Sequence, residues 1–517
     1  MPVRGFKKAV SAIFLRLFVQ QMFNAITSTH SRKKGYGRGT GYFLLRRPQV
    51  MTMENRESYI LGEMKISKAF WTLALPAILT MIAKSVYSAV DTMYIGFLGN
   101  NAALAAVGIV SPLLVLLQSF ETVLSQGICV LVGRKLGEGK KEEADSIVST
   151  TLATSIGFGI FFCCVSFLCM DPLLKLFGAS AEVLPYARQY GVWVFVSILF
   201  TMPAACLNNA ARGESAVKVA SNSILIGTLL NVILDPIFIF DFGLGLGVAG
   251  ASIATTISQA VSLLCVASYY IRGKSLVKIR FSAVHHHKAM YRNLVSIGLP
   301  MAVFQSLISG ASAFTNSAMA GLPDGDIYIT AYSVIQKLVI IVTFIFLGLI
   351  QGLQPILAFS AGAKNGKRFR EGLAYSAKML VLVALSISAA CFFSGKWIMS
   401  LFSPDPSVTQ AGELLLRSQT IFCAMFAMSF LIMVAFQALG KGVQGIIIAI
   451  SRQGLLYIPL VTILPRFFGF NGVLAAQPIA DLLSLILVAC MFPQLKRLTH
   501  QLEAEKLPEG SQPETGK

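Results

Sequence analysis

Residues 217–240 have the sequence VKVASNSILIGTLLNVILDPIFIF. A bilayer core of about 30 Å needs about 20 apolar residues in a helix, so this stretch predicts a membrane-spanning helix. From Val219 to Phe240 its only charged residue is Asp235. A charge at that depth costs at least about 2.5–3.5 kcal/mol, which makes a functional role the first hypothesis.

The whole chain has the composition of a membrane protein. Of its 517 residues, 55% are hydrophobic and 13% are charged, and the mean hydropathy is +0.69. Soluble domains carry roughly 25% charged residues, so this chain lacks a polar shell. We therefore expect lipid to be the solvent for most of the fold.

The same length criterion identifies twelve spans, and we predict an all-α integral membrane protein with twelve transmembrane helices. The spans are residues 69–98, 104–133, 146–170, 189–211, 217–240, 248–271, 293–320, 328–360, 374–402, 416–439, 445–466 and 472–494.

The net charge of +19 lies mainly outside these spans. Ten basic residues precede Met53, and many others occupy loops after even-numbered spans, such as residues 134–141, 272–288 and 364–370. Basic loops stay on the cytoplasmic side. We therefore expect a multi-pass protein of the cell membrane (the inner membrane of a bacterial cell) with both termini in the cytoplasm, and no nucleic-acid partner.

The two halves of the sequence repeat each other at offsets of 222 to 225 residues. The matching pairs are Leu75-Pro76 with Leu299-Pro300, Gln126-Gly127 with Gln351-Gly352, and Gly247, Gly250 and Ala254 with Gly469, Gly472 and Ala476. Each half holds six spans, which predicts two pseudo-symmetric six-helix bundles with the substrate path between them.

We divide the chain accordingly into a basic amino-terminal segment (1–64), a first lobe (65–285), a second lobe (286–497) and a polar tail (498–517). Residues 1–52 carry no span. They form either an interfacial amphipathic segment or sequence upstream of a true start at Met51 or Met53, and we favour the late start.

Two acids in the first half lie at matching depth. Asp91 is about seven residues from the outer end of its span and Asp235 about five, so at 1.5 Å per residue they differ by about 3 Å in height. Asn231 lies one turn before Asp235, and Thr255 of the next span falls at the same level. Such oxygen ligands suit Na⁺, and paired buried carboxylates also hold a proton. The alternative is two independently hydrogen-bonded carboxylates.

The second half does not duplicate these acids, since Asp91 corresponds to Thr315 and Asp235 to about Ile458. Three further polar residues are ambiguous. Glu121 either lines a cavity or hydrogen-bonds to a neighbouring helix, and Lys337 is considered as a partner for Asp481.

The sequence contains no P-loop, no HExxH and no nucleophile elbow, and its nine cysteines form no CxxC pair. We therefore predict that the protein is not an enzyme. We also expect no metal site and no cofactor apart from a coupling ion, Na⁺ or H⁺.

With these residues in view, the chain resembles the multidrug and toxic compound extrusion (MATE) family over roughly residues 65–495. The resemblance rests on residues 88–96 (SAVDTMYIG), 105–108 (AAVG), Gln126-Gly127, Arg212-Gly213, 231–236 (NVILDP) and 250–255 (GASIAT).

The resemblance implies two lobes that rock about a central cavity and export amphipathic, often cationic compounds against inflow of Na⁺ or H⁺. It places the ion site on Asp91, Asn231, Asp235 and Thr255. Span seven offers Gln305 and Asn316 but no carboxylate, so the alternative acid site of some family members is not carried over.

The position of Lys84 differs from the family pattern, because members of this type often have a neutral amide side chain there. We keep four cavity candidates: Lys84, Glu121, Gln305 and Asn316. The expected partners are a small-molecule substrate and the lipid bilayer, with the protein a monomer. The alternative function is a flippase for lipid-linked oligosaccharides or a related lipid.

Overall fold

The structure is a computed structural model that describes residues 53–403 and 405–504. The predictions for residues 1–52 lie outside these residues. Because lipid offers no partner for free backbone groups, spans must satisfy their hydrogen bonds internally, and the regular elements of the described part are all helical.

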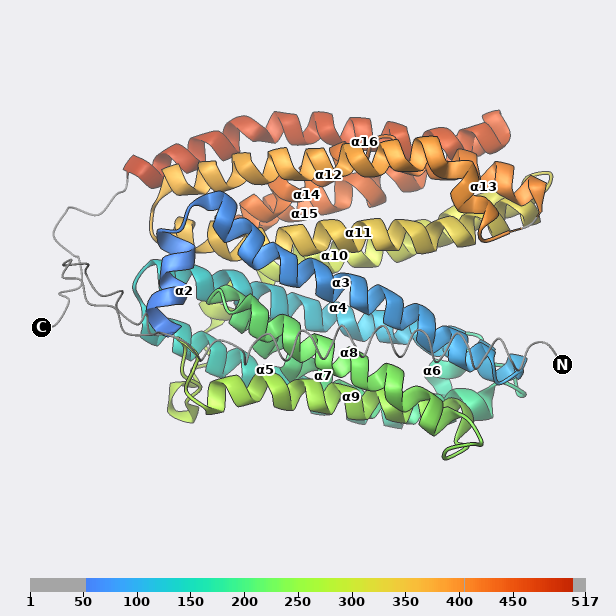
Figure 1. Cartoon of the computed structure of the whole chain (residues 1–517), viewed down its shortest axis with the longest axis horizontal. Coiled ribbons are helices and arrows are strands. Elements are labelled where there is room, and N and C mark those ends of the chain that lie inside the picture. The colour runs from blue at the N-terminus through green and yellow to red at the C-terminus, as the bar shows by residue number, and fades with distance from the viewer. Residues whose placement is uncertain (1–52, 404, 505–517) are drawn as a thin grey trace, which may run out of the picture. The chain divides into compact units, whose positions relative to one another are not determined.

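The first lobe follows a short helix, α2 (Met53–Gly62), and occupies the lower half of Figure 1. Its long helices are α3 (Ile66–Gly96), α4 (Asn101–Gly137), α5 (Lys141–Leu168), α7 (Leu184–Gly213), α8 (Val217–Ile239) and α9 (Gly247–Ile271), with the short α6 (Met170–Leu176) between α5 and α7.

The second lobe occupies the upper half of Figure 1. Its helices are α10 (Lys288–Ala320), α11 (Gly325–Gly362), α12 (Gly366–Ser400), α13 (Pro406–Thr420), α14 (Cys423–Ala438), α15 (Gly442–Ile450), a π-helical segment (Ser451–Tyr457) and α16 (Ile458–Ala504).

The helix boundaries differ from the twelve predicted spans at two places, and a break in the helical backbone explains each difference. The chain bends by 41° at a short break between α13 and α14, and only together are these two helices long and apolar enough to cross a membrane. The 63-residue stretch Gly442–Ala504 contains Gly469 with φ 57° and ψ −136°, a backbone conformation open mainly to glycine. Gly472 then packs against the Leu464 carbonyl. The chain therefore reverses here and forms two spans, and the twelve-helix prediction agrees with this arrangement.

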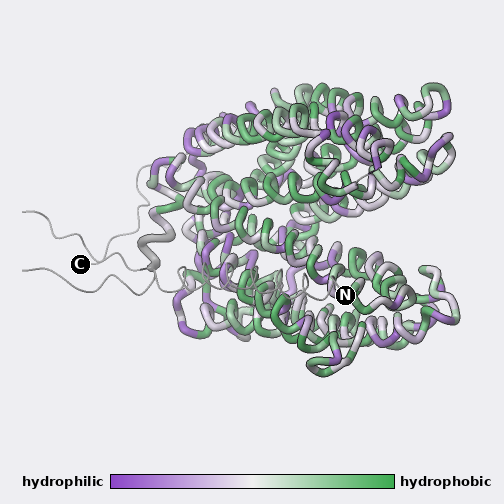
Figure 2. Tube along the Cα trace, turned by 45° about the vertical axis from the view of Figure 1, so that its right-hand side comes forward, coloured by the Kyte–Doolittle hydropathy of each residue, from purple (hydrophilic) through white to green (hydrophobic). Residues whose placement is uncertain are grey.

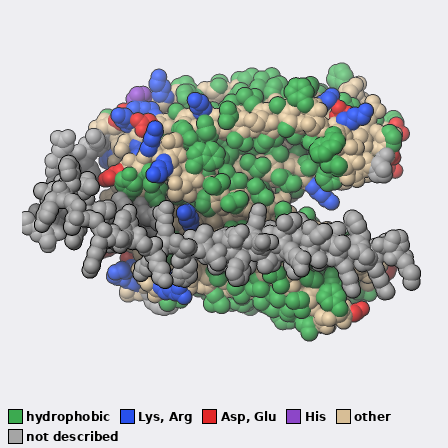
Figure 3. Space-filling view, viewed as in Figure 1, with side chains coloured by type: hydrophobic (Ala, Val, Ile, Leu, Met, Phe, Trp, Pro, Cys, Tyr) green, Lys and Arg blue, Asp and Glu red, His purple; other side chains and the backbone are tan. Residues whose placement is uncertain are grey.

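The surface matches a lipid environment. In Figure 3 hydrophobic side chains cover the middle of the helices, and many lysine and arginine side chains gather toward one end. Phe393 and Ile271 are more than 80% exposed, at 83% and 84%. Exposed apolar surface on this scale marks an interaction site, which for long apolar helices is the bilayer.

The lobes meet near the end that carries the basic loops, called here the basic end. A β-carbon on Gly298 of α10 would overlap the Val123 carbonyl of α4, and one on Gly352 of α11 would overlap Ala74 of α3. Small residues of this kind let membrane helices approach closely. Toward the opposite end the helices of the two lobes diverge, as Figures 1 and 2 show.

Candidate functional site

The structure brings three of the four predicted ion-site residues into direct contact. Asn231 and Asp235 lie one turn apart on α8, and Thr255 faces them from α9. The Nδ2 group of Asn231 donates to Asp235 Oδ1 over 3.1 Å and to Thr255 Oγ1 over 3.3 Å. Asp235 is fully buried and Asn231 is nearly so. One amide therefore holds the carboxylate and the hydroxyl together.

The fourth residue, Asp91 on α3, lies within electrostatic reach of Asp235. Three oxygens of this group are buried without a hydrogen-bond partner among the described residues: Asp91 Oδ1, Asp235 Oδ2 and Asn231 Oδ1. Unpartnered buried oxygens cost about 1–3 kcal/mol each, more when charged. The arrangement can therefore hold a proton or a hard cation, which would restore the missing partners.

Two tyrosines complete the group and were missed in the sequence. Tyr87 on α3 lies close to Thr255 and within electrostatic reach of Asp91. Tyr190 on α7 lies within reach of both acids. The position of Tyr87, four residues before Asp91, puts both on one helix face and was a usable signal. No signal existed for Tyr190, because its helix is distant in sequence.

The cavity candidates of the first lobe form a separate group. The exposed Lys84, in the middle of α3, and Glu121 on α4 are within electrostatic reach of each other. Thr201 of α7 also lies close to Glu121. Buried Arg212 adds its positive charge near Lys84.

The candidates of the second lobe have different surroundings. Gln305 Oε1 accepts a 3.4 Å hydrogen bond from Thr122 across the lobe boundary, and Asn316 is exposed. The suggested Lys337–Asp481 pair is wrong. Lys337 is exposed, whereas Asp481 is buried and accepts from Arg452 Nε over 2.6 Å. The π-helical segment, which no local pattern indicated, carries Arg452.

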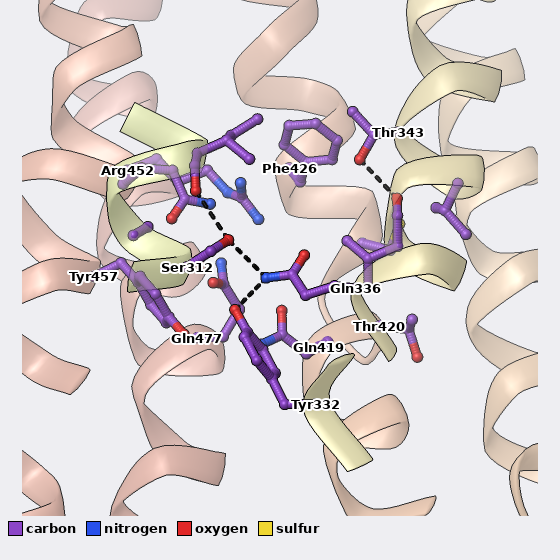
Figure 4. A pocket seen from close by; sticks show the side chains of 16 residues that line it. Ser312, Tyr332, Gln336, Thr343, Gln419, Thr420, Phe426, Arg452, Tyr457 and Gln477 are labelled. Atoms are coloured by element: carbon purple, nitrogen blue, oxygen red, sulfur yellow. Dashed lines mark hydrogen bonds between the residues drawn. The ribbon is translucent and has the colours of Figure 1, made fainter. Parts of the chain in front are cut away.

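The second lobe also contains a cavity of about 70 Å³ between α10, α11, α13, α14, the π-helical segment and α16 (Figure 4). Its polar lining includes Ser312, Tyr332, Gln336, Gln419, Arg452, Gln453, Tyr457 and Gln477.

Comparison with known proteins gives a family. Residues 76–237 and 300–463 match the MatE family profile. The multidrug export protein MepA of Staphylococcus aureus (strain NCTC 8325 / PS 47) is 25% identical over 458 residues, which cover 89% of this chain and all of that protein. MepA of Staphylococcus haemolyticus (strain JCSC1435) is 26% identical over 433 residues, 83% of this chain and 94% of that protein.

Solved structures share the fold. A crystal structure of MATE in complex with MaL6 covers 87% of this chain and 99% of its own, with a TM-score of 0.80 and 22% identity. The outward-facing conformation of a multidrug resistance MATE family transporter of the MOP superfamily covers 86% and 98%, with the same TM-score and identity. With both lobes matched by the profile and the whole architecture shared, the chain belongs to the MatE family and is a MATE family transporter.

Proposed function

We propose that this protein exports organic compounds, including several chemically unrelated ones, in exchange for Na⁺ or H⁺ that enters at Asp91, Asn231, Asp235 and Thr255. The observation that carries the proposal is the set of three unpartnered buried oxygens shared by two acids and an amide. The names of the MepA relatives, both multidrug export proteins, support export over lipid flipping.

The coupling follows from where the acids lie. With no cation, the two carboxylates repel each other across α3 and α8, and a bound proton or Na⁺ removes that repulsion. Helix α3 also packs against the second lobe, since Ala74 adjoins Gly352 of α11. A shift of α3 at Asp91 is therefore passed to the lobe boundary, where it favours one of two packed arrangements.

The orientation belongs to the same proposal. By the positive-inside rule, the lysine- and arginine-rich loops favour a cytoplasmic location for the basic end, where the described chain begins and ends. The lobes pack together at that end and diverge at the other, so in this orientation the proposal assigns the structure to an outward-facing state.

The test is dye efflux from everted membrane vesicles, with Na⁺ and H⁺ gradients imposed separately. Asp91→Asn and Asp235→Asn each remove one charged ligand, worth about 1.5–3 kcal/mol, and each is expected to lower gradient-driven export about tenfold or more. Only the gradient of the true coupling ion should support export by the unmodified protein.

The matched control is Asp241→Asn, which removes an exposed acid just beyond the end of α8. It should export at the normal rate. Undiminished export by both site variants, at equal amounts of protein in the membrane, would disprove the coupling site.

A further inference from the structure

The cavity of the second lobe is the repeat counterpart of the ion site. Gly247 and Gly250 match Gly469 and Gly472 at an offset of 222 residues. The same offset relates Asn231 to Gln453 and Thr255 to Gln477, and it relates Asp235 to Tyr457, one residue before the position expected above. These three counterparts line the cavity together. The counterpart of Asp91, Thr315, hydrogen-bonds with Tyr457 over 2.8 Å.

The charge of this second site differs from that of the first. Neither acid is kept, and the charged side chain that lines the cavity is Arg452. Its Nε group donates to Asp481, and its guanidinium lies 4.3 Å from the centre of the Phe426 ring. No hydrogen bond to its terminal amino groups is found among the described residues, and Figure 4 shows the side chain reaching into the cavity beside Phe426.

Buried polar side chains form the lining of this second site. Gln453 is 7% exposed and its Oε1 atom is buried without a hydrogen-bond partner in the described part of the chain, while Gln477 is 3% exposed and donates to Asp481 over 3.0 Å. Apolar side chains, among them Ile308 and Val339, form the remaining wall. The cavity therefore combines a planar cationic fork with an apolar surface.

We propose that this cavity binds the carboxylate group of an organic anion through the terminal amino groups of Arg452, and that Asp481 takes up one proton when the anion binds. A guanidinium fork matches a carboxylate bidentately, and Phe426 with the apolar wall would receive the hydrocarbon body. Export of the bound anion rests on the proposed function. Binding of the anion does not, because it can be measured without transport.

The proton follows from the balance of charge. Arg452 and ionised Asp481 are together neutral, so an added carboxylate would leave one buried negative charge uncompensated, which is unfavourable. A proton moves from hydronium or the buffer acid to Asp481, so that the donor's bond to it breaks, one O–H bond forms on the carboxyl group, and Arg452 is left to pair with the ligand. The other titratable group facing Asp481 in the described residues is the Cys423 thiol of α14.

Calorimetric titration of the purified protein with benzoate tests the site. In two buffers of different ionisation enthalpy, binding should take up about one proton per benzoate, and the uncharged isostere benzamide should bind about tenfold more weakly or worse, with no proton uptake. Asp481→Asn should bind benzoate with no proton uptake, because the amide resembles the protonated acid.

A double variant, Arg452→Gln with Asp481→Asn, removes both charges and so avoids leaving one of them buried alone. It should lose benzoate binding about tenfold or more. The matched control is Arg417→Gln with Glu413→Gln, an ion pair that lies outside the cavity and whose arginine also stacks on a phenylalanine ring. This control should bind benzoate normally.

Three outcomes would overturn the proposal: no benzoate binding by the unmodified protein, undiminished binding by the double variant, or equal proton uptake with chloride alone, which would make the site one for inorganic anions. In vesicles, the double variant should lower the export of fluorescein relative to ethidium. A fourth overturning outcome is an unchanged ratio while Asp91→Asn still shows lowered export, which would remove the subsite and leave the proposed function standing.

Discussion

At the scale of single residues, Asn231 organises the ion site. Its amide nitrogen bonds both Asp235 and Thr255, while its oxygen remains unpartnered in the described structure beside those of the two acids. Hydrogen bonds to a charged group are worth about 1.5–3 kcal/mol. The geometry of the acid therefore depends on a neutral neighbour.

Asn231→Leu tests this dependence. The substitution keeps the size of the side chain but removes both hydrogen bonds and one ligand oxygen. We expect the half-saturating concentration of the coupling ion to rise about tenfold, equivalent to about 1.4 kcal/mol, as measured from the export rate at graded Na⁺ or H⁺. Asn222→Leu, an exposed position on the same helix, is the control. An unchanged half-saturating concentration would contradict this role.

At the scale of elements, the segment between α9 and α10 belongs structurally to the first lobe. Glu214 Oε2 accepts from the backbone nitrogens of Leu276 and Val277 at 2.8 and 3.2 Å. Asp145 Oδ1 accepts from the Lys278 nitrogen at 2.8 Å. The connection is thus fixed to one side, and relative motion of the lobes must be absorbed near the start of α10.

Glu214→Ala should release this segment, because two buried backbone donors lose their acceptor at about 1–3 kcal/mol each. We expect faster tryptic cleavage after Lys274 or Lys278, followed by mass spectrometry of the fragments. Glu182→Ala, an exposed acid before α7, should leave the cleavage rate unchanged. Equal protection in both variants would show that the carboxylate does not hold the segment.

At the scale of the whole molecule, the present state depends on close approach of the lobes at the basic end. Gly298 lies against the Val123 backbone, and Gly352 against that of Ala74. Packed interfaces of this kind hold discrete arrangements rather than deforming continuously. Changing one such glycine should therefore shift the population between whole-molecule states.

Gly298→Val should favour the state that is open at the basic end, because its side chain cannot occupy the space taken by the Val123 carbonyl. With spin labels at Lys140 and Lys367, both exposed, pulsed electron resonance should show a longer distance distribution than in the unmodified protein. Gly310→Val is the matched control on α10, since a β-carbon there meets open space. Identical distributions in the two variants would refute the argument.

The sequence alone was sufficient for the membrane fold. Each span must satisfy its own backbone hydrogen bonds and be apolar over a fixed length, so the spans can be recognised from local composition, and the repeat then indicates two lobes. The tenth span was predicted as a single helix, whereas it is bent between α13 and α14. Helical rise also allowed Asp91, Asn231, Asp235 and Thr255 to be placed at one depth before any packing was known.

What only the tertiary structure decided is which helices are neighbours. Tyr190 reaches the acids from α7, and Asp481 pairs with Arg452 rather than with Lys337. Depth along a helix follows from counting residues, but rotation about its axis and the choice of partner depend on packing among all twelve spans. The repeat offset relates Gln453, Tyr457 and Gln477 to the first site, but only the structure shows that Arg452, on the π-helical segment, lines the same cavity.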